Sequence, residues 1–176
     1  MVDKKELAKA IKMSSFLTGQ FKLRSGKISS FYWDKYRFES DPKLLSAITQ
    51  SMAKLLPATF DKLAGMELGG IPLATALSLT TGKPCLFVRK VAKDYGTCNL
   101  VEGGFKVGEI AVVIEDIITT AGQVATSIEQ MRKLGLIIKD VLCVIDREQG
   151  GKEKLKEIGC SLTALFQMSE LEKLTS

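Results

Sequence analysis

Hydrophobic and polar positions follow two different periods along this chain. Apolar residues recur at helical spacing in residues 3–13 and again in residues 44–55. From residue 62 onward, short apolar runs take turns with further helical patterns. The apolar runs predict strands at residues 62–66, 85–88, 110–114, 141–145 and 162–166, and the helical patterns predict helices at residues 72–80, 122–134 and 152–158. Such alternation of strands and helices is typical of a parallel α/β sheet.

Residues at the ends of these elements agree with the predicted pattern. Asp41 and Pro42 are typical of a helix N-cap followed by proline in the first turn, while Gly135 and Gly159 are typical helix ends. Residues 21–38 are rich in aromatic side chains and predict an extended segment or hairpin. Because no repeat or low-complexity linker divides the sequence, we expect a single domain over residues 1–176.

Composition and charge narrow the classes of function. The chain has no histidine, which excludes Ser-His-Asp and Cys-His catalysis and the usual zinc sites. Its net charge of +5 favours an anionic partner, and the lack of a long basic run favours small phosphorylated substrates over nucleic acid. No apolar run approaches the roughly 20 residues needed to span a membrane, and no signal peptide is recognisable, so we expect a cytoplasmic protein.

Residues 110–122 carry the most informative chemistry. Their apolar run ends in two adjacent acids, Glu115 and Asp116, and the turn Thr119-Thr120-Ala121-Gly122 precedes a predicted helix. A buried strand would bring the acids to the carboxyl edge of a sheet, and a helix N-terminus binds phosphate through free N–H groups. The usual nucleotide and dinucleotide signatures are absent. We therefore predict a ribose-phosphate ligand, the alternative being a capped turn with solvated acids.

This segment resembles the phosphoribosyl-pyrophosphate (PRPP) signature of type I phosphoribosyltransferases. In that family the acid pair holds the ribose hydroxyls and the following loop wraps the 5′-phosphate. The resemblance implies an α/β fold with a parallel sheet flanked by helices and a small N-terminal hood from about residues 1–40. The PRPP-binding residues that it implies here are Glu115, Asp116, Ile117, Ile118, Thr119, Thr120, Ala121, Gly122 and Gln123, with Asp116 also counted as catalytic.

Residues 89–97 are a charged segment that follows a predicted strand. One interpretation is a solvated loop without a binding role. The Arg-Lys-x-x-Lys-Asp pattern, however, resembles the catalytic loop of orotate phosphoribosyltransferases. In that family the loop closes over the pyrophosphate, partly across a dimer interface. The resemblance implies that Arg89, Lys90 and Lys93 bind PRPP, that Lys93 stabilises the leaving group, and that the protein is a homodimer. Tyr95 stands where many members carry histidine.

Two further segments resemble the parts of this family that bind PRPP and the base. Residues 21–34, otherwise a hairpin with aromatic core residues, are similar to its N-terminal motif. The similarity implies that Arg24 reaches PRPP and that Tyr32 and Trp33 lie beside the base, where a flat pyrimidine can stack. Residues 68–74 look like its pyrophosphate-binding loop, with Gly69 at a position where some members have lysine.

Residues 146–151, otherwise a strand end and turn, resemble the family's Asp-Arg-x-x-Gly-Gly motif. The implied role of Arg147 is to bind the orotate carboxylate, because its planar guanidinium matches a carboxylate with two parallel hydrogen bonds. Thr119 completes the implied orotate-binding set of Tyr32, Trp33, Thr119 and Arg147. Arg147 is the residue that most favours orotate over uracil or a purine.

Taken together, these segments imply transfer of the 5-phosphoribosyl group from PRPP to orotate, giving orotidine 5′-monophosphate and pyrophosphate in pyrimidine biosynthesis. The resemblance also implies Mg²⁺ held mainly through PRPP, with no metal ligands from the protein and no nucleic-acid or membrane partner. Two alternatives stay open. One is a phosphoribosyltransferase for a purine or uracil, and the other is a non-enzymatic PRPP-sensing regulator on the same fold.

Overall fold

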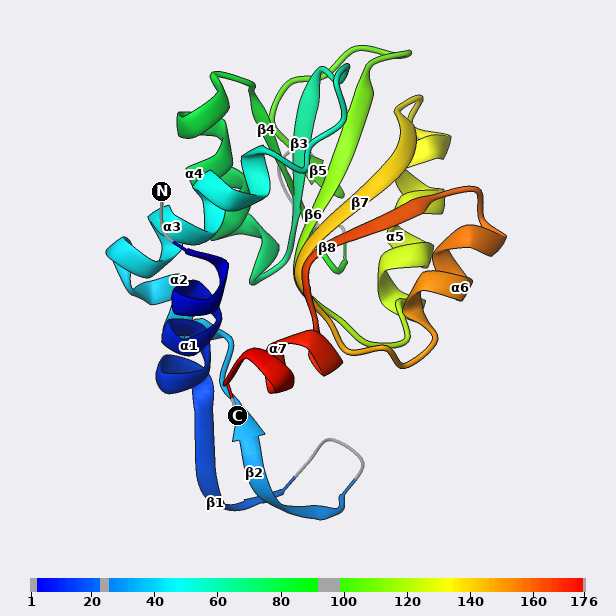
Figure 1. The fold of residues 1–176 in the computed structure, drawn as a ribbon. Helices are drawn as coiled ribbons and strands as arrows, with labels where there is room; N and C mark the ends of the chain where they lie inside the picture. Colours follow the sequence, from blue (N-terminus) through cyan, green and yellow to red (C-terminus); the bar gives the residue numbers. More distant parts are fainter. Residues whose placement is uncertain (1–2, 23–25, 92–98, 176) are drawn as a thin grey trace.

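A six-stranded sheet forms the centre of the computed structural model, which describes residues 3–22, 26–91 and 99–175 (Figure 1). Its strand order is β5-β4-β3-β6-β7-β8. All neighbouring strands are parallel except β4 and β5, which are antiparallel. The strands are β3 (Lys62–Met66), β4 (Cys85–Val88), β5 (Val101–Glu102), β6 (Ile110–Ile118), β7 (Ile137–Asp146) and β8 (Ser161–Gln167).

Helices cover both faces of this sheet (Figure 1). On one side lie α1 (Lys4–Ser15), α2 (Tyr36–Ser40), α3 (Pro42–Ala53), α4 (Gly70–Thr81) and α7 (Met168–Thr175). On the other side lie α5 (Gly122–Lys133) and α6 (Gly151–Glu157). The fold is therefore α/β, with a mainly parallel sheet between two helical layers, as the strand-helix alternation predicts.

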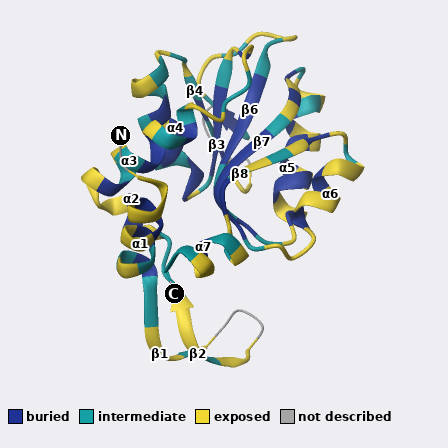
Figure 2. Cartoon of the chain, viewed as in Figure 1, coloured by how far each residue is buried: buried dark blue, intermediate teal, exposed yellow. Residues whose placement is uncertain are grey.

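Strand β6 is buried on both faces, which explains its continuous apolar run. Val112 and Ile114 belong to the core on the α4 side, while Ala111 and Val113 belong to the core on the α5 side. Successive side chains of a strand point to opposite faces, so one apolar run supplies both cores. Figure 2 shows the buried strands between helices whose outer surfaces are exposed.

The N-terminal hairpin stands apart from this sheet. Strands β1 (Phe16–Lys22) and β2 (Ile28–Trp33) pair antiparallel in a separate two-stranded sheet. The Phe16 ring packs against Phe31 and Trp33, with ring centroids 5.6 and 5.4 Å apart. The hairpin projects from the body near the edge of the main sheet where β6 and β7 end (Figure 1). Its residues Phe31, Tyr32 and Trp33 line a cavity together with Ile117 and Arg147 at that edge.

Several boundaries differ from those predicted. Strand β6 continues to Ile118, four residues beyond its predicted end, because Glu115, Ile117 and Ile118 still pair with β7. Helix α4 begins at Gly70, ahead of Pro72. Strand β5 lies in the polar stretch 90–108, where no strand is predicted, and it exists through pairing with β4. The short helix α7 was not predicted either. Within the described ranges no helix has both the length and the apolar character needed to cross a membrane.

Candidate active site

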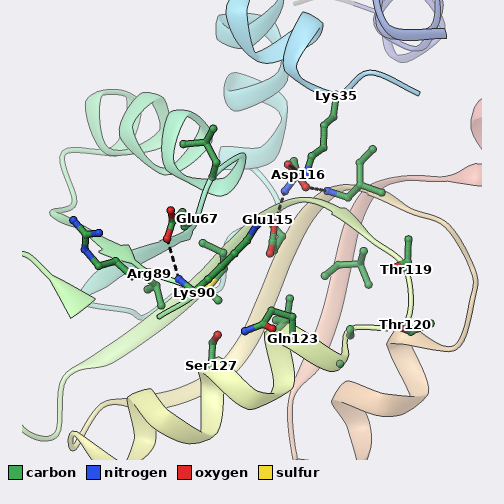
Figure 3. Close-up of a pocket in the computed structure, with 18 of the residues that line it drawn as sticks. Lys35, Glu67, Arg89, Lys90, Glu115, Asp116, Thr119, Thr120, Gln123 and Ser127 are labelled. Carbon is green, nitrogen blue, oxygen red and sulfur yellow. Dashed lines mark hydrogen bonds and ion pairs between the residues drawn. The ribbon is translucent and has the colours of Figure 1, made fainter. Parts of the chain in front are cut away.

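The predicted PRPP signature lines one cavity of about 570 Å³ at the carboxyl ends of β3, β4 and β6 (Figure 3). All residues from Glu115 to Gln123 border it, together with side chains from β4 and from the start of α2. The cavity lies where ligands bind in parallel α/β sheets, outside the carboxyl ends of the strands. The structure thus brings the whole predicted segment to one concave surface.

The turn between β6 and α5 presents backbone N–H groups to this cavity. Ala121 has a left-handed backbone, with φ of 55°, and no side chain caps the helix that follows. Gly122, Gln123 and Val124, the first residues of α5, border the cavity. N–H groups in the first turn of a helix have no partner within the helix. This turn therefore has the geometry of an anion site, to which Thr119 and Thr120 add hydroxyl groups.

Gly150 and Gly151 allow α6 to start close behind this turn. A Cβ at Gly151 would lie 2.5 Å from both the Thr119 carbonyl oxygen and the Ile118 Cγ2. Gly150 has φ of 86°, a conformation that side chains disfavour. The two glycines of the 146–151 segment thus have a packing role beside the predicted anion site.

Asp116 is the most buried acid of the site and forms an ion pair. Its side chain is 1% exposed, and Lys35 Nζ lies 2.5 Å from its Oδ2. Its Oδ1 accepts a hydrogen bond from the backbone N–H of Ile117 at 2.5 Å. Burial alone would lower the pKa of Lys35, but attraction and hydrogen bonding to Asp116 outweigh it and raise that pKa. Figure 3 shows Lys35 reaching the acid from above the ends of the strands.

Two other acids close to Asp116 have raised pKa values. Burial raises the pKa of Glu115 to about 8, and the negative charge of Asp116 adds to the effect. Burial likewise raises the pKa of Glu39, in α2, to about 9, again with a contribution from Asp116. Raised carboxyl pKa values of this kind are concentrated at functional sites.

Gly69 permits the close approach of Asp116 and Glu39. A Cβ at this position would lie 1.6 Å from Asp116 Oδ2 and 2.7 Å from Glu39 Oε1. Any side chain here would displace both acids. Some phosphoribosyltransferases have lysine at this position. In this chain the lysine side chain would clash with Asp116 and Glu39, which explains why glycine is found here.

A second cavity, of about 360 Å³, adjoins the first. It shares Lys35, Ile117 and Thr119 with the larger cavity, and its other lining residues come from the hairpin and from the end of β7. The predicted orotate-binding residues Tyr32, Trp33, Thr119 and Arg147 all line it. The structure therefore places the two predicted ligand sites next to each other.

Arg147 has a fixed backbone and an unsatisfied side-chain donor. Its backbone N–H donates to the Ile118 carbonyl oxygen at 2.8 Å, which ties the start of the 146–151 turn to β6. Its buried Nε has no hydrogen-bond partner among the described parts of the chain. A buried donor without a partner is costly, so this guanidinium is prepared to bind an acceptor.

Of the three cations predicted to bind PRPP in the 89–97 segment, Arg89 and Lys90 lie within the described residues. Arg89 and Lys90 border the larger cavity. Arg89 Nε lies 3.2 Å from Glu102 Oε1, and the backbone N–H of Lys90 donates to Glu67 Oε2 at 2.9 Å. Lys93 and Tyr95, like Arg24 of the hairpin, lie outside the described residues, so the roles predicted for them stay predictions.

Sequence reasoning missed several residues of this site. Lys35 borders both cavities, Glu39 meets Asp116, and Glu67 and the buried Ser127 border the larger cavity. No local pattern marks them, because tertiary contacts alone bring them to β6. The one sequence signal near them is the pair Gly69 and Gly70, because adjacent glycines allow another segment, here β6, to approach the backbone closely. Within the described ranges, no group of three or more His, Cys, Asp or Glu side chains is placed to hold a metal ion.

Comparison with known proteins agrees with the family that the motifs suggest. No protein-family model matches the chain. It is 46% identical to an orotate phosphoribosyltransferase from a Nocardioides species over 156 residues, covering 89% of the chain and 87% of the relative. It is 43% identical to that of Methanocella arvoryzae over 167 residues, covering 94% and 95%. The Mycobacterium tuberculosis orotate phosphoribosyltransferase in complex with PRPP superposes with a TM-score of 0.82 at 26% identity, covering 97% of this chain and 99% of that one.

Proposed function

The chain belongs to the orotate phosphoribosyltransferase family, and we propose which of its residues bind each substrate and stabilise the reacting groups. It is a phosphoribosyltransferase of pyrimidine biosynthesis, acting on PRPP and orotate. The observation that carries the assignment of residues is the pair of adjoining cavities. One contains the signature for a ribose phosphate, and the other contains aromatic rings and an arginine.

PRPP occupies the larger cavity in this proposal. Its 5′-phosphate binds to the Thr119–Gly122 turn and the N-terminus of α5, where free N–H groups and the helix dipole favour an anion. The carboxyl oxygens of Glu115 and Asp116 accept hydrogen bonds from the ribose hydroxyls. This arrangement points C1 of the ribose toward Ile117 and Thr119, which the two cavities share.

Orotate occupies the smaller cavity. Arg147 binds its carboxylate with two parallel hydrogen bonds and so satisfies the buried Nε. Tyr32 and Trp33 contact the flat pyrimidine ring, and Thr119 offers a hydroxyl at the junction with the PRPP site. A base without a carboxylate would leave the Arg147 guanidinium unpaired, which supports orotate over uracil or a purine.

The reaction breaks the C1–O bond to pyrophosphate, and the electron pair leaves with the pyrophosphate oxygen. The orotate ring nitrogen forms the new bond to C1 with the electron pair of its N–H bond, and the proton of that bond passes to the departing pyrophosphate or to water. Arg24, Arg89, Lys90 and Lys93 neutralise the charge that develops on the leaving diphosphate. Because the chain has no histidine, its main contributions are positioning and electrostatic stabilisation.

Mg²⁺ is the metal ion that this chemistry calls for, since it would neutralise diphosphate charge when bound. Acidic side chains border the larger cavity, and Mg²⁺ commonly binds in proteins together with substrate phosphates, which fits an ion that arrives with PRPP. In this proposal the ion is held mainly through PRPP, while the acid pair Glu115 and Asp116 holds the ribose hydroxyls. A homodimer in the cytoplasm completes the proposal, with the 89–97 loop of one subunit serving its partner's site.

The test is to mix the protein with PRPP, Mg²⁺ and orotate and to follow the loss of orotate absorbance. A parallel panel of uracil, adenine, guanine and hypoxanthine measures base specificity. We expect turnover of orotate and little of the other bases. Preferred turnover of another base would overturn the assignment of Arg147, and tight nucleic-acid binding without any turnover would support a regulator instead.

A further inference from the structure

An unusual group of charges lies behind the acid pair proposed to hold the ribose. Asp116 and Glu39 are buried, with 1% and 7% of their surface exposed. Their oxygens border the same small space above Gly69, and Lys35 Nζ contacts Asp116 Oδ2 at 2.5 Å. Lys35 is the N-cap of α2, and Glu39 lies one helical turn later in the same helix, so both reach β6 from one element.

The protons in this group can be assigned from hydrogen-bonding capacity. Glu39 Oε1 is buried and has no donor within the described chain, and Asp116 Oδ2 has only the Lys35 ammonium. Ionised carboxylates can only accept hydrogen bonds, and two of them side by side in a buried place repel each other. One proton between them converts this repulsion into a donor–acceptor pair.

Glu39 is the acid that holds this proton. Asp116 already accepts from the backbone N–H of Ile117 and pairs with Lys35, and both contacts favour its ionised form. Glu39 has neither contact, and its burial beside Asp116 raises its pKa to about 9. The charged groups that act most strongly on Glu39 are Asp116 and Glu115 on β6 and Lys35 at the start of α2.

We propose that Glu39 is a positioning residue of the active site, whose neutral carboxyl group donates a hydrogen bond to Asp116 and holds that carboxylate toward the ribose of PRPP. This inference rests on the proposed ribose-binding role of Asp116. Lys35 is the exchangeable partner of Asp116, because its side chain is 32% exposed and borders both cavities. When PRPP binds, a ribose hydroxyl replaces Lys35 as the partner of Asp116, while the hydrogen bond from Glu39 to Asp116 is kept.

A specific pH dependence follows from this arrangement. Below pH 9 the Glu39 carboxyl group is neutral and donates to Asp116. Above that pH it loses the proton, and a second negative charge then lies against Asp116 and competes for Lys35. PRPP affinity should therefore fall in alkaline solution, although the phosphate groups of PRPP no longer titrate there.

The experiment measures PRPP binding without orotate by calorimetry between pH 7.5 and 10. The variants are Glu39→Gln, which keeps a donor but cannot ionise, Glu39→Ala, which removes it, and Glu129→Gln on the exposed face of α5 as a control. We expect Glu39→Gln to bind within about threefold of wild type at pH 7.5 and Glu39→Ala about tenfold more weakly. Between pH 9 and 10 wild type should lose about tenfold, and Glu39→Gln should not.

A second readout separates this inference from the proposed function. The infrared difference spectrum between wild type and Glu39→Gln at pH 7.5 should contain the carbonyl band of a protonated carboxyl group. Absence of that band, or parallel loss of PRPP affinity in both proteins above pH 9, overturns the role of Glu39 while PRPP binding by wild type stands. If Asp116→Asn binds PRPP as wild type does, the ribose role of Asp116 fails, and the inference fails with it.

Discussion

Arg147 is the residue on which recognition of the base depends in the proposed site. Its buried Nε lacks a hydrogen-bond partner within the described chain, and its side chain borders the cavity that also holds Tyr32 and Trp33. A carboxylate of the ligand would supply both the missing acceptor and the opposite charge.

We expect Arg147→Ala to raise the KM for orotate by about 100-fold, because truncating one partner of a buried charge pair costs roughly 2–5 kcal/mol. The KM for PRPP should change by less than about threefold, since the two ligands occupy different cavities. Steady-state kinetics with each substrate varied in turn measures both values.

Arg147→Lys is the matched control for this substitution. It keeps the positive charge but loses the planar fork, so we expect an intermediate KM for orotate. An orotate KM unchanged in Arg147→Ala would show that the carboxylate binds elsewhere.

The signature residues 115–123 could be predicted because they are contiguous in the sequence. A strand, an acid pair, a small-residue turn and a helix start are all encoded in one short segment. Lys35 and Glu39 could not be predicted as partners of Asp116, because α2 and β6 are far apart in the sequence. Nothing local distinguishes Lys35 from the many solvated lysines of this chain.

The turn between β6 and α5 is the element proposed to bind the 5′-phosphate. Its path depends on Gly151 at the start of α6, where a Cβ would lie 2.5 Å from the Thr119 carbonyl oxygen. The backbone of one element therefore restricts the side chain that its neighbour can carry. This close contact explains why residue 151 of the 146–151 motif is a glycine.

We expect Gly151→Ala to lower the free energy of unfolding by about 1–3 kcal/mol, the usual range for overpacking a close contact. It should also weaken PRPP binding, because the methyl group pushes Thr119 and its turn into the cavity. Urea denaturation and PRPP calorimetry on the same protein measure the two effects.

Gly104→Ala is a suitable control, because a Cβ at that glycine has no atom within 4 Å. Its unfolding free energy should stay within about 0.5 kcal/mol of wild type. If Gly151→Ala behaved in the same way, the close approach of α6 to the turn would not matter for the site.

Strand β5 and the extension of β6, which the sequence did not predict, are created by tertiary pairing. Strand β5 consists of two residues in a polar stretch, too short for any period to appear, and its existence depends on the neighbouring β4. Strand β6 extends through two acids because β7 continues to pair with it. The longer strands and helices could be predicted, because the spacing of apolar residues within each segment already indicates which of its faces is buried.

At the scale of the whole molecule, the buried acids give stability a definite pH dependence. The pKa values of Glu39 and Glu115 rise from an ordinary 4.5 to about 9 and about 8 on folding. The folded state therefore retains protons that the unfolded state has released. The stabilisation from these protonated groups is fully present below pH 4.5 and is lost as pH rises through 8 and 9.

We therefore expect the melting temperature of the wild type to fall between pH 5 and pH 9, with each unit of raised pKa worth about 1.4 kcal/mol. Glu39→Gln should show a shallower fall, because one of the titrating groups is removed. Thermal unfolding of both proteins in buffers of matched ionic strength measures the difference. Identical slopes would mean that Glu39 ionises in the folded protein with an ordinary pKa.

The proposed homodimer predicts complementation between two inactive variants. Lys93→Ala should lower turnover strongly without changing folding stability, and Asp116→Asn should impair use of PRPP. If the loop serves the partner's site, a mixed dimer contains one site with both residues intact. After subunit exchange of an equal mixture, activity should return to about a quarter of the wild-type value.

Activity that stays as low as in the separate variants would show that the loop acts within its own subunit. Sedimentation verifies that dimers are present, and native mass spectrometry, which separates the mixed dimer from the two homodimers by mass, verifies that the subunits have exchanged. Mixing Lys93→Ala with Glu129→Gln, which should retain activity, controls for losses during the procedure.

By itself, the sequence determined the α/β class, most of the strands and helices, and the contiguous donor-site segment. These properties are encoded locally, through hydrophobic period, end signals and adjacent functional groups. Two features could be seen only in the folded protein: the hairpin aromatics and Arg147 form a cavity next to the proposed ribose site, and Lys35 and Glu39 meet Asp116 above Gly69. The physical reason is that these contacts join residues from separate elements, and their charge states depend on a burial that no single segment encodes.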